Sequence, residues 1–226
     1  MAKSTGLQIV NKVLKNLGES TVSDLLSLAG ISLMVFDTVN ELLYDLATEY
    51  KYAPLEEDGT ITLSTGIAST PLPSDMYDFD KDSFRYDNSK YIDYMTPQRF
   101  DREYITQTNS GTPDAITKWK DVWKPYPIPA SGANGKAINY RYWKIPTIFA
   151  TATPTGTCWM PEGFDLTLLA DYVTFKVLHY KHNEEALTYY TKVWGDGKLN
   201  EGSLARFKAI YGSPQLLDEN IFSEPL

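Results

Sequence analysis

The spacing of apolar residues changes twice along this chain, and that change limits the fold more than any other feature. Near both ends, apolar side chains recur every three or four residues, as they do on one face of an α-helix. In the middle, short β-branched or aromatic runs are separated by Gly and Pro, which is typical of strands and turns. The sequence therefore predicts helices over these ranges: 4–17, 21–28, 31–50, from about 162, 184–194 and 201–211.

The middle of the chain, from about 58 to 147, predicts a β-rich segment. The predicted strands are TITLS (60–64), SFRYD (83–87), YIDYM (91–95), ITKW (116–119) and INYRYW (138–143), with a helical turn at 97–104. SGANGK (131–136) is a strong turn signal, and we expect it to join 121–129 to 138–143 as a hairpin. The prolines at 125, 127 and 129 lack an amide donor, so 121–129 is expected at an edge or an exit of the sheet.

This order of elements predicts an α+β fold. The N- and C-terminal helices would pack together as a helical bundle, and the middle would form a small antiparallel or barrel-like sheet. The expected division is N-terminal helices at 1–54, a β-rich insert at 55–150, C-terminal helices at 151–211 and an extended C-terminal tail at 212–226.

Charge argues against a nucleic-acid-binding protein. The net charge is −8, and the acidic excess lies in 1–70 and 147–226, whereas 71–146 is nearly neutral. A protein that grips phosphates needs a basic surface. The single cysteine, Cys158, excludes an intrachain disulfide and a four-cysteine zinc site. The first ten residues lack the apolar core of a signal peptide, and the apolar run 25–36 is too short for a membrane span. We expect an intracellular protein without membrane contact.

The residues that might carry chemistry are few. His179 and His182 have helical spacing and are followed by Glu184 and Glu185, a set that could hold a metal. The favoured interpretation is a helix end, where His and Lys complement the helix dipole. Cys158 could act as a nucleophile only with a histidine partner.

Three further patterns have simpler explanations than chemistry. The acidic run Asp75, Asp78, Asp80 and Asp82 lacks the Gly and Glu of an EF-hand, which favours a solvated strand entry. GDGK (195–198) matches no phosphate-binding motif and predicts a turn between helices. Six aromatic residues near lysines could stack on bases, but a strand with one buried face gives the same alternation. They are Trp119, Trp123, Tyr126, Tyr140, Tyr142 and Trp143. We expect no enzyme activity, no cofactor and no metal.

Seven segments, taken in order, resemble the head-to-tail adaptor (connector) proteins of tailed bacteriophages. The resemblance covers about 7–211. The segments are NKVLKNLGE (11–19), ATEYKYAP (47–54), STPLPSDMYDFD (69–80), GTPDAITKWKDVWKPYPIP (111–129), NYRYWKIP (139–146), WMPEGFDLTLLADYVTFKVLHY (159–180) and ALTYYTKVW (186–194).

The resemblance implies a structural virion protein in the neck between portal and tail, present in the host cytoplasm during assembly. Such adaptors form a homo-oligomeric ring, dodecameric to match the portal, that contacts the portal protein and tail or neck proteins. DNA passes through the ring without specific binding. In such adaptors a terminal segment commonly extends to the portal. Here four apolar residues of the tail would make that contact: Leu216, Leu217, Ile221 and Phe222. The same residues could instead pack on the chain's own helices.

Two other functions remain open from the sequence. The chain could be another neck or tail component, such as a tail-tube or stopper subunit, or a carbohydrate-binding β module with an exposed aromatic platform. It could also be an enzyme that uses His179, His182 and Glu185 or a carboxylate pair.

Overall fold

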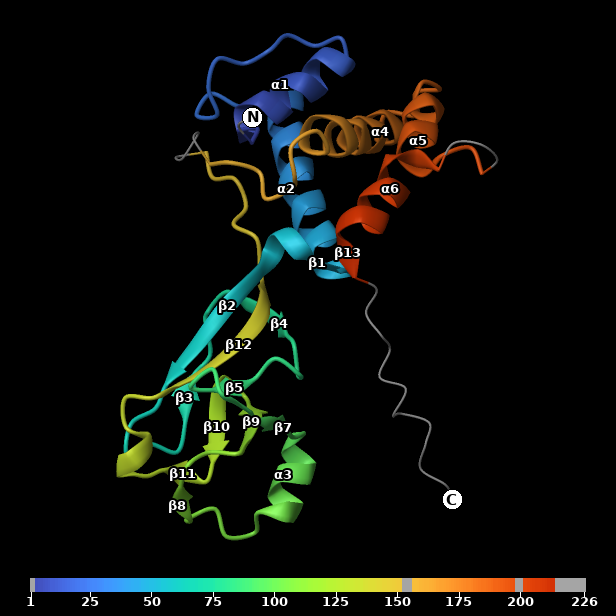
Figure 1. Cartoon of the computed structure of the whole chain (residues 1–226). Helices are drawn as coiled ribbons and strands as arrows, with labels where there is room; N and C mark the ends of the chain where they lie inside the picture. Colours follow the sequence, from blue (N-terminus) through green and yellow to red (C-terminus); the bar gives the residue numbers. More distant parts are fainter. Residues whose placement is uncertain (1–2, 152–155, 198–200, 214–226) are drawn as a thin grey trace. The chain divides into compact units, whose positions relative to one another are not determined.

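The computed structural model describes residues 3–151, 156–197 and 201–213 (Figure 1). The chain divides into two compact units. The first, the helical unit, is formed by the segments Met1–Leu55 and Ile145–Leu226, and the second, the β unit, is Glu56–Lys144. The predicted α+β class is confirmed, because helices from both ends of the chain contact one another and the strands lie between them in sequence.

The described residues contain six α-helices, five of them in the helical unit. These five are α1 (Gly6–Asn16), α2 (Ile31–Glu49), α4 (Ala170–Tyr180), α5 (Ala186–Trp194) and α6 (Gly202–Tyr211). Helix α1 packs on α2 and α4, and helix α5 contacts both α4 and α6 (Figure 1). The short strands β1 (Lys51–Tyr52) and β13 (Gly212–Ser213) pair antiparallel next to α2 and α6.

The helices predicted at 4–17, 31–50, 184–194 and 201–211 are confirmed, with small changes at their ends. A capping box begins α1, in which Thr5 and Gln8 satisfy each other's backbone amides. The core of the helical unit is built from apolar residues of α1, α2 and α4. They include Ile9, Val10, Val13, Leu14, Val35, Val39, Leu42, Leu43, Leu46, Val173 and Val177.

The helix predicted at 21–28 is wrong, because these residues form turns. The Asp24 carboxylate accepts hydrogen bonds from the backbone amides of Leu26 and Ser27 at 2.8 and 2.9 Å. A short acidic side chain that captures nearby amides offers the backbone an alternative to a helix. Leu25 is nevertheless buried, so the apolar residue that suggested a helix anchors a loop instead.

A π-helical turn, Asp165–Leu169, precedes α4 and contains a buried carboxylate. Asp165 Oδ2 accepts a hydrogen bond from the Ser4 backbone amide at 2.9 Å. Its Oδ1 accepts from the amides of Gly163 and Leu166 at 3.1 and 2.8 Å. Asp165 therefore fastens the start of the chain to the start of the C-terminal helices.

We predict that Asp165→Ala lowers the free energy of unfolding by about 3 kcal/mol, since one buried and two partly buried amides lose the carboxylate that accepts their hydrogen bonds. Urea denaturation followed by circular dichroism measures the change. The control is Asp24→Ala, whose carboxylate also accepts backbone amides but lies in solvent, and whose loss should be clearly smaller. Equal losses in the two variants would show that burial of the Asp165 anchor is unimportant.

The β unit consists of short strands and one helix, α3 (Pro97–Glu103), which confirms the helical turn expected there. Its strands are β2 (Glu56–Thr62), β3 (Thr70–Pro71), β4 (Met76–Phe79), β5 (Arg85–Tyr86), β6 (Lys90–Tyr91), β7 (Asp93–Tyr94), β8 (Ser110–Gly111), β9 (Ala115–Trp119), β10 (Val122–Tyr126), β11 (Ile128–Pro129) and β12 (Ala137–Lys144).

Two main sheets form from these strands. One has the order β2-β12-β5-β6, with β4 also paired to β12, and the other has the order β3-β10-β9-β7. Most pairings are antiparallel, whereas β7 runs parallel to β9 and β8 parallel to β11. Within the described residues no sheet closes into a barrel. Of the two forms expected for the insert, antiparallel or barrel-like, the structure has the antiparallel one.

The hairpin predicted between 121–129 and 138–143 is wrong. Strand β10 pairs with β9 and β3, and β12 belongs to the other sheet (Figure 1). The hairpin that forms is β9–β10, joined by Lys120 and Asp121, because a two-residue link favours local pairing. The turn at 131–136 does form, but it leads from β11 to β12.

Strand β10 is paired on both sides only at its start, which explains how it accommodates Pro125. Its partner β3 reaches only Val122 and Trp123, so one side of the strand is unpaired at Pro125. A residue without an amide donor is tolerated where no ladder bond is required.

Aromatic side chains fill the core of the β unit. The Trp123 ring lies 4.9 to 5.2 Å from the rings of Phe79, Phe84 and Tyr140. Phe84 also stacks on Tyr140 at 5.2 Å. Edge-to-face and stacked pairs at these separations are favourable beyond the burial of their area. The aromatic run of the sequence is therefore mainly the inner face of a sheet.

Candidate functional surfaces

The two histidines lie at the end of α4, as the favoured interpretation of the sequence predicts. His179 is in the last turn and stacks on Phe175 with ring centroids 5.5 Å apart. His182 follows the helix with a positive φ, and its amide donates to the His179 carbonyl at 3.0 Å. Across the part of the chain that the structure describes, no three His, Cys, Asp or Glu side chains are grouped as metal ligands would be.

Cys158 is buried, which makes it a poor nucleophile. Its backbone amide donates to the Ser4 carbonyl at 2.9 Å, next to the Asp165 anchor. Burial raises the pKa of the Cys158 thiol to about 12. A reactive cysteine needs a lowered pKa and access to solvent, and Cys158 has neither.

Four of the six aromatic residues that might have stacked on bases are buried. Trp123, Tyr126, Tyr140 and Tyr142 point into the β unit, whereas Trp119 is 40% exposed. Strand β12 alternates these buried aromatic residues with the exposed Arg141, as a strand with one buried face requires. Most of the run therefore belongs to the core of the β unit and is not an exposed aromatic platform.

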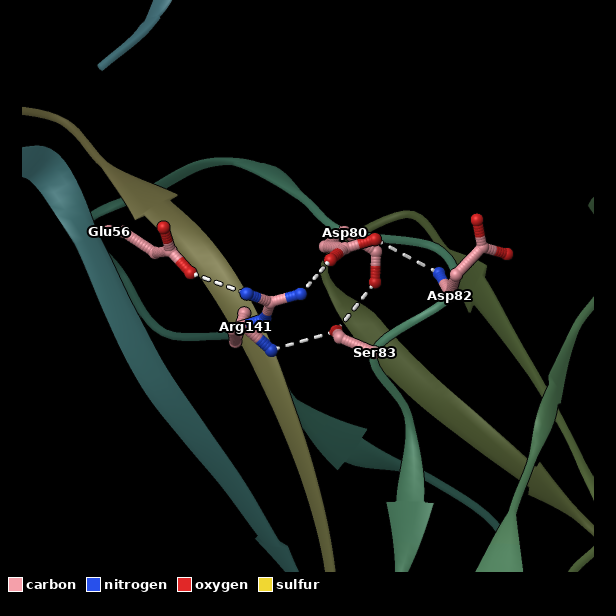
Figure 2. Close-up of polar contacts among 5 residues, drawn as sticks. All are labelled: Glu56, Asp80, Asp82, Ser83 and Arg141. Carbon is pink, nitrogen blue, oxygen red and sulfur yellow. Dashed lines mark hydrogen bonds and ion pairs between the residues drawn. The ribbon is translucent and has the colours of Figure 1, made fainter. Parts of the chain in front are cut away.

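Two residues of the acidic run at 75–82, Asp80 and Asp82, take part in a hydrogen-bonded loop (Figure 2). Asp80 Oδ2 pairs with Arg141 Nη2 at 2.7 Å, and Glu56 Oε1 pairs with Arg141 Nη1 at 3.0 Å. The Asp82 amide donates to Asp80 Oδ1 at 3.1 Å. Asp75 lies apart from this cluster and accepts from the Tyr142 hydroxyl at 3.4 Å.

Backbone bonds complete the cluster around Arg141. The Arg141 amide donates to Ser83 Oγ at 2.9 Å, and that hydroxyl donates to the Asp80 carbonyl at 2.7 Å. The Asp80 amide in turn donates to the Arg141 carbonyl at 3.0 Å. Arg141 thus joins β2, β12 and the link between β4 and β5 (Figure 2). This role was not predicted from the sequence. The signal for it was a polar residue, Arg141, between aromatic residues that point into the core.

We predict that Arg141→Met costs only about 0.5–1 kcal/mol of stability, because the ion pairs are half exposed and screened by solvent. Its main effect should be local, as faster amide hydrogen exchange at Asp82 and Ser83. Lys136→Met, which breaks the exposed pair with Asp87, is the control and should leave that exchange unchanged. Unchanged exchange in Arg141→Met would mean that the loop is held by its backbone bonds alone.

Residues of the described part of the helical unit line two open hollows. One is lined by Phe175, His179, Asn183, Glu184, Ala186, Leu187 and Tyr190 of α4, α5 and the turn between them. The other is lined by Gly163, Phe164, Thr167, Asp171, Lys192, Ser203 and Arg206. Burial raises the pKa of Asp171, and the nearby Lys192 opposes that rise. Neither hollow contains a nucleophile paired with a base.

The tail residues expected to bind a partner lie outside the described residues. These are Leu216, Leu217, Ile221 and Phe222; the described chain ends with β13. Among the described helices, none combines the length and apolar character required to cross a bilayer.

Comparison with known proteins identifies the class. The sequence profile described as SU10 adaptor protein matches residues 4–207, nearly the whole chain. The chain therefore belongs to the SU10 adaptor protein family, a family of phage head-to-tail adaptors, and the resemblance seen in the sequence is confirmed. No curated protein matches the chain. The family is a structural one, consistent with a protein that is not an enzyme, and it implies a place in the virion neck.

Proposed function

We propose that this protein assembles as a ring beneath the portal of a tailed phage, and that the tail docks on this ring. The match to the SU10 adaptor family over residues 4–207 carries the proposal. Closed rings of identical subunits are common among homo-oligomers, and a ring that matches the portal's symmetry would be dodecameric. Assembly would take place in the host cytoplasm, and the finished ring would lie in the neck of the virion.

The charge of the chain supports a channel that passes DNA without holding it. Each subunit carries a net charge of −8, and repetition around a ring would build a strongly negative collar. Carboxylates repel phosphates within about one Debye length, roughly 8–10 Å at physiological salt. DNA could then slide through without specific contacts.

The two units would make different contacts in the assembled virion. The helical unit, formed by both ends of the chain, would pack against its neighbours in the ring. The β unit would carry contacts toward the tail, and it exposes apolar side chains that suit such contacts, including Ile67, Tyr91 and Ile105.

The C-terminal tail, 212–226, is our proposed portal contact. Its sequence combines the apolar residues Leu216, Leu217, Ile221 and Phe222 with three acidic residues and no basic ones after Ser213. A segment of this composition can order on a partner and bury a few apolar anchors there.

The test is a pull-down with tagged protein expressed during phage production. The variant replaces the four apolar tail residues with Ser, and the matched control is Asp218→Asn with Glu219→Gln. We expect wild type and control to recover the portal protein, and the Ser variant to lose it. Recovery of only tail components by wild type would place the protein lower in the virion. Equal recovery of portal by all three would show that the tail is not the docking segment.

A further inference from the structure

The surface formed by α4 and α5 exposes an unusual amount of aromatic and apolar side chain. Leu187 is 69% exposed and Tyr190 is 43% exposed. Together with Phe175 and Ala186 they line one of the hollows described above, which we name the α4–α5 groove. Exposed apolar patches of this kind mark binding surfaces in soluble proteins.

Ring contacts hold the aromatic residues of the groove in place. Phe175 contacts the rings of Tyr190 and Trp194 at 5.7 and 5.0 Å, and Tyr190 stacks on Trp194 at 4.8 Å. Tyr172 extends this set, with its ring 4.7 Å from that of Trp194. These contacts fix the rings before any partner arrives, which reduces the entropy lost on binding.

Carboxylates lie at one end of the groove. Glu184 lines it in the turn before α5, and Glu185 follows directly. A further carboxylate, Glu41 of α2, lies 3.6 Å from Lys176 Nζ on the neighbouring α4 and is therefore already paired.

The basic side chains near the groove are already engaged. Lys176 pairs with Glu41, Lys181 lies 3.6 Å from Glu19, and Lys192 lies over the Tyr189 ring at 4.2 Å. His179 lines the groove and stacks on Phe175. Among the described residues, no cation pairs with Glu184 or Glu185. The border of the groove is therefore acidic, and it complements a basic partner.

We propose that the α4–α5 groove binds a basic amphipathic helix of another protein. Apolar side chains of that helix, one turn apart, would rest on Leu187 and Tyr190, and its Lys or Arg residues would face the acidic border. This is the arrangement in which an amphipathic helix lies in an apolar groove.

Charge also argues against the chain itself as the occupant. Residues 213–226 have apolar anchors, but they contain Asp218, Glu219 and Glu224 and no Lys or Arg. That segment of a second copy would meet the acidic border with like charge. The groove proposal rests on this surface alone and does not require the portal ring.

The experiment measures binding of fluorescein-labelled peptides to the purified full-length protein by fluorescence anisotropy. The first probe is an amphipathic peptide of about 18 residues, with Leu at i, i+3, i+4 and i+7 and Lys on its polar face. The second has Glu in place of Lys. The third is the chain's own segment 213–226.

We expect the basic peptide to bind most tightly and to weaken as salt rises, because salt screens the charges. Leu187→Ser should weaken it about tenfold, as expected for an anchor contact. Ile210→Ser is the matched control, since Ile210 is 64% exposed on α6, and it should have no effect. Combined Glu184→Gln and Glu185→Gln should reduce the salt dependence.

Three results would overturn the proposal. The first is tighter binding of the acidic peptide or of the 213–226 peptide than of the basic one. The second is equal binding of the basic peptide by wild type and Leu187→Ser, including the case in which neither binds. The third is a change of oligomeric state in Leu187→Ser, measured by sedimentation, since the groove would then face another copy. A failed portal pull-down with intact peptide binding would reject the proposed function and leave the groove standing.

Discussion

The pairing of β2 with β12 is the interaction on which the rest of the structure depends. It runs in unbroken antiparallel register from Glu56 opposite Trp143 to Thr62 opposite Ala137. Bringing the two ends of the β unit together costs conformational entropy. The seven paired positions and the aromatic core beneath them offset that cost. Because the two ends of the β unit are paired, the chain can leave the helical unit after Leu55 and re-enter it at Ile145. Helices from both ends can then share one core.

The sequence correctly predicted the helices and the strand face that local patterns determine. Helical periodicity located α1, α2, α5 and α6, and alternation in 138–143 assigned the aromatics to a buried face. It failed where a distant partner or a single side chain decides the outcome. Asp24 diverts a segment with helical spacing into a turn, and β12 finds β2 rather than its neighbour β10. The position of Arg141 on the outer face of its strand was visible in the sequence, but its partners Glu56 and Asp80 were not, because only the sheet brings these residues together.

The described residues that might have carried chemistry have structural roles. His179 is stacked at a helix end, and Cys158 is buried with a raised pKa. What the chain offers instead is contact area of two kinds. We propose that the apolar residues of the acidic tail bind the portal, and that the α4–α5 groove binds a basic helix rather than this tail. An adaptor with both kinds of surface can contact different partners without binding itself through them.

The most direct test of the account is native mass spectrometry of the purified protein mixed with the portal ring of its phage. The account predicts a complex with as many copies of this chain as the portal has subunits, formed by the full chain. It also predicts that removal of residues 213–226 abolishes the complex. A chain that stays free of the portal under conditions that preserve the portal ring would contradict the adaptor ring.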